Sequence, residues 1–380
     1  MIRAEDMAGR LDVRPGAPLP GALRSERRDW ASRLAPGRPA AVLPGLLASL
    51  FSLCSHAHRL CAQLAISAAA PGAVPAPADA AQRLRLETAQ EHVRRIGLDW
   101  PRLLAGAPVP EALASLQGSP LLRPARAGDG PDWAAALAWL ESEWLQMPAA
   151  TWLRAWQACG ADWLIDWSQR HGGWLPGLLR AAREADTGPA VPMDHALRVH
   201  ADGEGLRALA QALAQTPGFA MHPRWRDACA HTGTWSRLHR RDEGLALTPW
   251  AMLGSRLAEL ARLCLPAPAG HEGWLAHGAL RLGSGQGLAW VEMARGLLFH
   301  SVDLVDVAGA SEVRACHVLA PTEWNFHPQG EVARRIAALD VSVPGELLQR
   351  QVNLIMVAFD PCVPFHTGLA QDRAREVDHA

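Results

Sequence analysis

Lysine, tyrosine and C-x-x-C cysteine pairs are all missing from this 380-residue sequence, and no apolar run approaches the length of a membrane span. Arginine supplies all the basic charge, and the 37 basic residues nearly balance 38 acidic ones. This balance argues against a nucleic-acid-binding protein whose affinity comes from phosphate neutralisation. The charged N-terminus, MIRAEDMAGR, lacks the apolar core of a signal peptide. We therefore expect a cytoplasmic protein with neither nucleic acid nor membrane as a partner.

The composition is otherwise that of a folded protein. Hydrophobic residues make up 49% of the chain and charged residues 20%, so a sizeable core can form and global disorder is excluded. GC-rich codon usage explains both the missing lysine and tyrosine and the abundant alanine, arginine, proline and glycine. The arginine content is therefore not interpreted as functional.

The cysteines are too irregularly placed for a disulfide framework. Their number is odd and no C-x-x-C pair occurs, which also argues against a structural zinc ribbon in a cytoplasmic chain. We expect most of them to be small buried hydrophobic residues. The seven are Cys54, Cys61, Cys159, Cys229, Cys264, Cys316 and Cys362.

The apolar spacing predicts a mainly α protein with a small β element near its C-terminal end, an α+β fold. Residues 1–38 are rich in proline, glycine and arginine and predict a loosely ordered arm, and residues 39–380 predict a single domain. Residues 280–325 carry β-branched and apolar runs between glycine-containing turns, which predicts two or three strands. Helical periodicity covers residues 40–67, 80–104, 131–183, 203–215, 246–263 and 331–357.

Five tryptophans recur at a spacing that predicts one helical face: Trp152, Trp156, Trp163, Trp167 and Trp174. A core stripe is the favoured interpretation, because large apolar side chains on one face are usually buried. The alternative is a docking surface for a partner helix, since tryptophan is enriched where proteins bind each other.

Two short motifs suggest chemistry at first sight. LGSGQG precedes a predicted strand and opens no helix, so a hairpin turn is favoured over a phosphate loop. In Cys54-x-His56-x-His58-x-x-Cys61, one helix cannot wrap four ligands around a zinc ion. We favour a site that Cys54 and His58 share with distant residues. One candidate is Cys362, which Asp360-Pro361 places where a helical run ends.

Four segments, in order along the chain, resemble motifs of the large subunit of nickel–iron hydrogenases. LCSHAH (Leu53 to His58) is similar to the second half of R-x-C-G-x-C-x-x-x-H, and VEMARGLLFH (Val291 to His300) to E-A-P-R-G-x-x-x-H. APTEWN (Ala320 to Asn325) is similar to P-[ST]-x-W-N, and FDPCVPF (Phe359 to Phe365) to the D-P-C-x-x-C end. HTGTWSR (His231 to Arg237) resembles a fifth segment. The resemblance implies a large-subunit-like helical fold.

The sequence departs from the family at two of its four metal-binding cysteines. Phe51 stands where the first N-terminal cysteine belongs, and Phe365 stands where the second C-terminal cysteine belongs. Only Cys54 and Cys362 remain, so a four-thiolate nickel site cannot be built. The family's acidic R-[IV]-E-G-H segment also has no counterpart. The resemblance therefore implies a protein that does not turn over hydrogen and is not an enzyme.

What remains of the family's site suits its iron alone, which carries two cyanides and one carbon monoxide. The resemblance implies that Cys54 and Cys362 bind this Fe(CN)2(CO) unit without nickel. Cyanide nitrogens need strong donors, and Arg295, Thr322 and the adjoining Pro321 match family positions around the cyanides.

Carbon monoxide needs an apolar wall, which Phe51 and Phe365 are expected to extend beside the two thiols. His58 matches a histidine next to the metal site and is a candidate donor to a thiolate. For His300 a buried core histidine is an equally good interpretation. For Arg295 the alternative is an ordinary ion pair with Glu292.

This combination is similar to the HupK/HoxV branch of hydrogenase expression/formation proteins. The resemblance implies a maturation scaffold that binds or transfers the iron unit, with hydrogenase maturation proteins as partners and the hydrogenase large subunit as a further candidate partner. The alternative is a metal-free chaperone of hydrogenase assembly with the same fold. An active hydrogenase is disfavoured by the missing thiolates.

The two phenylalanines lead to a prediction about metal content. Since half of the nickel ligands are replaced, we expect the anaerobically purified protein to contain iron but no stoichiometric nickel. We also expect it to show no hydrogen uptake with artificial acceptors. Elemental analysis and a hydrogen-uptake assay measure this. Nickel near one equivalent per chain would contradict the prediction.

Overall fold

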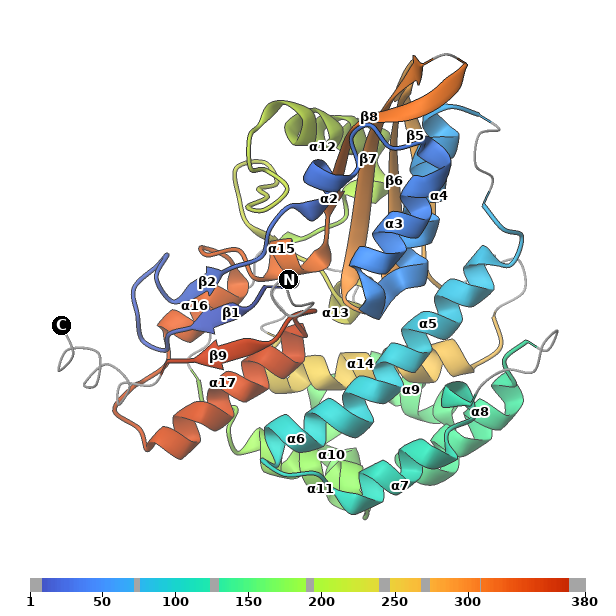
Figure 1. Ribbon diagram of the computed structural model, residues 1–380. Coiled ribbons are helices and arrows are strands. Elements are labelled where there is room, and N and C mark those ends of the chain that lie inside the picture. The colour runs from blue at the N-terminus through green and yellow to red at the C-terminus, as the bar shows by residue number, and fades with distance from the viewer. Residues whose placement is uncertain are drawn as a thin grey trace.

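The chain folds into a sheet-containing half and a helical half, seen at the top and bottom of Figure 1. The computed structural model describes residues 9–71, 76–123, 130–188, 195–238, 247–267, 274–307 and 309–368. A continuous buried core extends from Leu11 to Val363. The mainly α prediction with a small β element is confirmed.

The helices before residue 120 are α2 (Trp30–Leu34), α3 (Leu43–Leu50), α4 (Ser55–Ala69), α5 (Ala80–Arg94), α6 (Trp100–Leu104) and α7 (Pro110–Gly118). The middle helices are α8 (Trp133–Trp139), α9 (Ala149–Cys159), α10 (Ala161–Arg170), α11 (Trp174–Arg183), α12 (Gly203–Gln215), α13 (Thr234–Leu238) and α14 (Pro249–Cys264). The last helices are α15 (Pro321–Asn325), α16 (Glu331–Ala337) and α17 (Gly345–Phe359).

The main sheet is an antiparallel meander in the order β5-β6-β7-β8, formed by β5 (His277–Gly283), β6 (Gln286–Met293), β7 (Gly296–Val307) and β8 (Ala310–Leu319). Its four strands exceed the two or three predicted, and residues 321–325 are helical because Pro321 opens α15. The LGSGQG turn is confirmed, since Gly283 pairs with Gln286 across the β5–β6 hairpin. The short strands are β1 (Leu11–Val13), β2 (Leu23–Ser25), β3 (His195–Ala196), β4 (Ala230–His231) and β9 (Phe365–Thr367).

Both faces of the meander are covered. Ala289 and Val291 belong to the core shared with α4, whereas Leu288 and Phe299 belong to a second core beside α12. Figure 1 shows α3 and α4 along one face and α12 near the other. Strand side chains alternate between faces, so a sheet covered on both sides is apolar at nearly every position.

The helical run predicted over residues 40–67 is broken at Phe51. Phe51 leaves helical geometry with φ −114° and ψ 60°, and a 3-10 turn, Ser52–Cys54, follows before α4 begins. Helical segments Ala40–Leu50 and Ser52–Ala69 are bent by 106° relative to each other. Cys54 therefore lies in the turn before α4, whereas His58 and Cys61 lie within the helix.

Within the described ranges no single helix is long and apolar enough to cross a membrane. The two bent segments pass the length and composition test only when taken together.

The described part of the predicted arm, residues 9–38, is ordered, so this prediction is corrected. Strand β1 pairs antiparallel with β2 and parallel with β9. Leu11 and Val13 are fully buried and join the main core. Leu11 and Val13, at alternate positions of this short strand, make the contact with the core. The proline and glycine content of the segment obscured this short apolar pattern in the sequence.

The tryptophan stripe is part of the core. Trp152, Trp156 and Trp167 are buried, and Trp163 and Trp174 pack against them from partly buried positions. The stripe is divided among α9, α10 and α11 rather than lying on one helix, because the chain turns at Gly160 with φ +54°. Helix α14, buried along nearly its whole length, lies at the centre of these helices.

The close approach of α4 to β6 predicts the effect of one substitution. A Cβ on Gly287 would lie 2.2 Å from the backbone oxygen of Ala65, and neither backbone can move easily. We expect Gly287→Ala to lower the free energy of unfolding by about 1–3 kcal/mol through overpacking. Gly45→Ala in α3, which would meet nothing within 4 Å, should instead be neutral or stabilising. Urea denaturation of both variants is the measurement, and equal stabilities would contradict the prediction.

Candidate functional site

A cavity of about 130 Å³ lies where five parts of the chain meet: the N-terminal segment at residues 27–30, the α3–α4 junction, the β6–β7 turn, the start of α15 and the chain after α17. Seven of the eight residues predicted from the sequence line it: Phe51, Cys54, His58, Arg295, Pro321, Thr322 and Cys362. The other lining residues are Arg27, Arg28, Trp30, Leu50, Ser52, Leu53, Met293, Ala320 and Val363. Segments more than 300 residues apart in sequence thus meet in one small space.

Phe365 is the residue that the structure places elsewhere. It opens β9 and lines a larger hollow of about 900 Å³ on the outer side of Cys362. The expectation that its ring walls the cavity is corrected, because pairing of β9 with β1 directs the chain away. Cys362 lines both spaces, as do Leu53 and Val363.

Local geometry explains how Arg295 reaches the cavity. It lies in the two-residue turn between Met293 and Gly296, which pair across the β6–β7 hairpin. Gly296 has φ +134°, and a Cβ there would lie 2.6 Å from the Thr232 side chain. Only glycine permits that conformation and that approach, so the hairpin tip is fixed.

Two further hydrogen-bonded segments hold the cavity wall. Asn325 accepts from the Thr232 N–H at 2.9 Å and donates to the Thr232 carbonyl at 2.8 Å. The Thr232 hydroxyl accepts from the Leu297 N–H at 3.0 Å. The HTGTWSR and APTEWN segments therefore lock α15 onto the hairpin that carries Arg295.

The Cys362 sulfur lies in a polar environment. Arg27 Nη1 donates to it at 3.0 Å, and the Thr322 hydroxyl lies 3.1 Å away. Arg27 also donates from Nε to Glu323 at 2.7 Å. Arg27 was not predicted from the sequence, because nothing distinguishes it from neighbouring arginines in the segment interpreted as a loose arm.

The Cys54 thiol has the opposite environment. It is buried at the N-terminal end of α4, and burial raises the pKa of Cys54 far above its ordinary value. The positive charge of Arg295 opposes this rise, and the negative charge of Cys362 adds to it. The two sulfurs thus affect each other electrostatically, and both are under the field of Arg295.

The ion-pair partners of Arg295 are acidic residues other than Glu292, which was the alternative considered from the sequence. It pairs with Glu91 of α5, and its Nε lies 3.5 Å from Asp360. Glu292 accepts instead from the Ala276 N–H, which corrects the proposed Arg295–Glu292 pair. Within the described ranges, the buried Arg295 Nη1 has no hydrogen-bond partner. An unpaired buried donor costs free energy, so this nitrogen fits an acceptor bound in the cavity.

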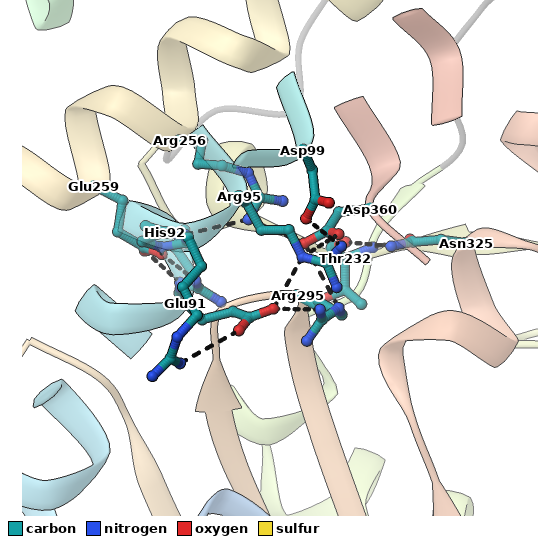
Figure 2. Close-up of polar contacts among 12 residues, drawn as sticks. Glu91, His92, Arg95, Asp99, Thr232, Arg256, Glu259, Arg295, Asn325 and Asp360 are labelled. Carbon is teal, nitrogen blue, oxygen red and sulfur yellow. Dashed lines mark hydrogen bonds and ion pairs between the residues drawn. The ribbon is translucent and has the colours of Figure 1, made fainter. Parts of the chain in front are cut away.

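A network of ion pairs behind Arg295 fixes its position, as Figure 2 shows. Asp360 lies 3.1 Å from Arg95 and 3.1 Å from Arg256, in addition to Arg295. Burial alone would raise the pKa of Asp360, but the three arginines hold it well below its usual range. Asp360 ends α17 with φ +53°, so the same residue terminates the helix and sets the direction of the chain that carries Cys362.

The network continues away from the cavity. Arg256 lies 3.2 Å from Nδ1 of His92, and His92 Nε2 lies 2.8 Å from Glu259. Glu259 accepts in turn from Nε of Arg237 at 2.8 Å. Arg237 and the buried side of α14 are thereby tied to the site.

His58 is oriented by a ring on each side. Its ring stacks on Phe51 with centroids 4.0 Å apart, and its Nδ1 lies 3.0 Å from Nε2 of His300. Burial lowers the pKa of both histidines, that of His300 to about 3, so both are neutral. The buried His300 Nδ1 has no partner within the described part of the chain. At this buried nitrogen an unpaired lone pair costs less than an unpaired N–H, so His300 carries its proton on Nε2 and donates it to Nδ1 of His58. The proton of His58 is then on its own Nε2.

Across the described ranges, no group of three or more His, Cys, Asp or Glu side chains could hold a metal ion. The cavity therefore offers two sulfurs, from Cys54 and Cys362, together with donors from Arg295, Arg27 and Thr322. Such a set suits a metal that brings most of its own ligands, in particular ligands that accept hydrogen bonds.

Comparison with known proteins identifies the fold. No protein-family model matches the chain. The nickel–iron–selenium hydrogenase of Desulfovibrio vulgaris Hildenborough superposes with a TM-score of 0.52 at 13% identity, covering 89% of this chain and 92% of that one. An NAD+-reducing nickel–iron hydrogenase superposes with a TM-score of 0.50 at 12% identity, covering 90% and 91%. The fold is thus that of the nickel–iron hydrogenase large subunit.

Full-length relatives then narrow the class. The chain is 40% identical to the hydrogenase expression/formation protein HoxV of Cupriavidus necator over 98% of both chains. It is 33% identical to the hydrogenase expression/formation protein HupK of Bradyrhizobium diazoefficiens over 94% of both chains. The chain belongs to the HoxV/HupK family of hydrogenase expression/formation proteins.

The arginine cluster around Asp360 yields a prediction for stability. Asp360→Asn leaves the buried guanidinium groups of Arg256 and Arg295, and the partly buried one of Arg95, with less compensation, so we expect a loss of about 3–5 kcal/mol at pH 7 in urea denaturation. Folding lowers the pKa of Asp360. The ionised carboxylate therefore stabilises the folded state above the ordinary aspartate pKa, and this stabilisation is lost on acidification. The difference between wild type and variant should narrow below about pH 5.

Asp99→Asn is the matched control, because Asp99 also pairs with Arg95 but is more exposed. We expect it to cost less than about 1 kcal/mol. A similar loss in both variants would show that the buried arginines do not depend on Asp360.

Proposed function

We propose that this protein is a non-catalytic maturation scaffold, which binds or transfers the Fe(CN)2(CO) unit during assembly of a nickel–iron hydrogenase large subunit. The observation that carries the proposal is that Arg295, whose buried Nη1 has no hydrogen-bond partner among the described residues, lines a cavity together with two thiols. The names of the full-length relatives, hydrogenase expression/formation proteins, support the maturation role.

The cavity chemistry fits the ligands of this unit. A ferrous ion with two cyanides and two thiolates is a net anion, and Arg295 and Arg27 provide positive charge beside both sulfurs. Arg295 Nη1 and the Thr322 hydroxyl would donate to cyanide nitrogens. Carbon monoxide, which is nearly apolar, would face Phe51, Met293 or Val363.

The composition of the site favours iron over nickel. Phe51 takes the position of one family cysteine inside the cavity, where its ring packs on His58. A site with two protein thiolates retains a metal less firmly than one with four, which suits a protein that passes its cargo on. The partners this function requires are hydrogenase maturation proteins, and the large subunit that receives the iron is a further candidate partner.

One observation favours the second candidate, a metal-free chaperone of hydrogenase assembly. The 900 Å³ hollow beside Cys362 is bordered by Leu53 and Leu98, both about half exposed. Exposed leucines beside a hollow are typical of protein-binding surfaces. The two functions differ in whether the purified protein carries cyanide and carbonyl ligands.

Infrared spectroscopy of anaerobically purified variants tests the first function. Bound cyanide and carbon monoxide absorb where proteins do not. We expect Cys54→Ala and Cys362→Ala each to abolish these bands, because each removes one of only two protein ligands. Cys159→Ala and Cys264→Ala should retain them, since Cys159 is exposed and Cys264 is buried outside the cavity.

The controls separate site loss from general damage. Equal retention of the bands in all four variants would refute the assignment of Cys54 and Cys362. A wild-type protein that supports hydrogenase maturation but never shows the bands would favour the metal-free chaperone.

A further inference from the structure

Arg27, which comes from the N-terminal segment, closes a ring of polar contacts around Cys362. Its Nη1 donates to the Cys362 sulfur at 3.0 Å, and its Nε donates to Glu323 at 2.7 Å. The Thr322 hydroxyl, next in sequence to Glu323, lies 3.1 Å from the same sulfur. The ring joins three segments: the N-terminal segment, the start of α15 and the chain after α17.

These contacts are shielded from water. The side chains of Arg27 and Glu323 are 10% and 7% exposed. Burial alone would lower the pKa of Arg27, but the nearby Cys362 and Glu323 raise it further than burial lowers it. Hydrogen bonds to charged groups in such surroundings are stronger than neutral ones, so the ring is expected to fix the sulfur position.

The segment that carries Arg27 is also tied directly to the Cys362 loop. Strand β1 pairs in parallel with β9, which begins three residues after Cys362. The Leu11 N–H donates to the Pro364 carbonyl at 3.0 Å, close to the cysteine itself. The N-terminal segment therefore holds this loop at the backbone through β1 and at the sulfur through Arg27.

We propose that Arg27 is the positioning residue for Cys362, and that through it docking of the N-terminal segment and binding of cargo are coupled. The positioning role stands on the geometry alone, whereas the coupling rests on the proposed function. A guanidinium fork suits this role, because one side chain must donate in two directions at once.

The coupling has a consequence for transfer. Interactions that stabilise the docked segment also hold Cys362 for the metal, and by reciprocity a metal on Cys362 stabilises the docked segment. Undocking of residues 9–38 would remove Arg27 and free one ligand. A partner that displaces the segment would thereby loosen the cargo without touching Cys54.

Hydrogen exchange followed by mass spectrometry tests the positioning role without any cargo. The variants are Arg27→Met, which loses both contacts, Arg27→Lys, which keeps the charge but loses the fork, and Glu323→Gln. Arg24→Met is the matched control, because Arg24 is an exposed arginine of the same segment. We expect Arg27→Met to speed hydrogen exchange roughly tenfold in peptides covering residues 11–25 and 359–368. Arg27→Lys and Glu323→Gln should have smaller effects on these peptides, and Arg24→Met should have none.

Infrared spectroscopy of the loaded protein tests the coupling. Removing a donor from a thiolate leaves more electron density on sulfur and iron, which strengthens back-donation to carbon monoxide. In Arg27→Met the remaining carbonyl band should therefore move to lower wavenumber and lose intensity. Arg24→Met should leave its position and intensity unchanged.

The two readouts separate the possible failures. Exchange in Arg27→Met that matches Arg24→Met overturns the positioning role, and should Arg27→Met not fold, Glu323→Gln decides the same question. Faster exchange with an unmoved carbonyl band overturns the coupling, leaving Arg27 as a structural tie. If wild-type protein shows no bands at all, the proposed function fails while the exchange result still decides the role of Arg27.

Discussion

The site depends on one buried carboxylate. Asp360 ends helix α17 in a left-handed conformation and lies among Arg95, Arg256 and Arg295, which come from three other parts of the chain. Because isolated charges are costly in a protein interior, these groups must stay together. Their meeting point brings α5, α14, α17 and the β6–β7 turn into one arrangement. It also sets Arg295 on one side of the cavity and Cys362, two residues after Asp360, on the other.

The cavity combines groups that a fold would not normally bury without compensation. Two thiols, a hydroxyl and a guanidinium, of which one nitrogen has no hydrogen-bond partner among the described residues, share about 130 Å³ with aromatic and aliphatic walls. Apolar walls strengthen every electrostatic interaction inside them, so such a space favours a compact anionic ligand. The environments of the two sulfurs differ, since Cys54 is deeply buried and Cys362 carries two polar neighbours. That asymmetry suits a scaffold in which one ligand is more easily released than the other.

Much of the site could be predicted, because its residues lie in short motifs whose local geometry the sequence encodes. Gly296 makes the tight turn that presents Arg295, and Asp360-Pro361 ends a helix immediately before Cys362. Phe365 was misplaced, because its motif position says nothing about the pairing of β9 with β1. Arg27 was missed for a related reason. A single arginine among several has no local signature, and its role arises only when the N-terminal segment docks.

The sequence by itself therefore determined the family and the mainly α fold with a small sheet, because each depends on residue identity or local periodicity. Tertiary structure alone decided which charges pair. Glu91 and Asp360, rather than the neighbouring Glu292, hold Arg295. It also decided that the N-terminal segment completes the cavity and that helices meet at an angle at Phe51. Ion pairs and strand pairings join residues hundreds of positions apart, and burial in the folded chain selects the partners because it makes an unpaired charge or backbone group costly.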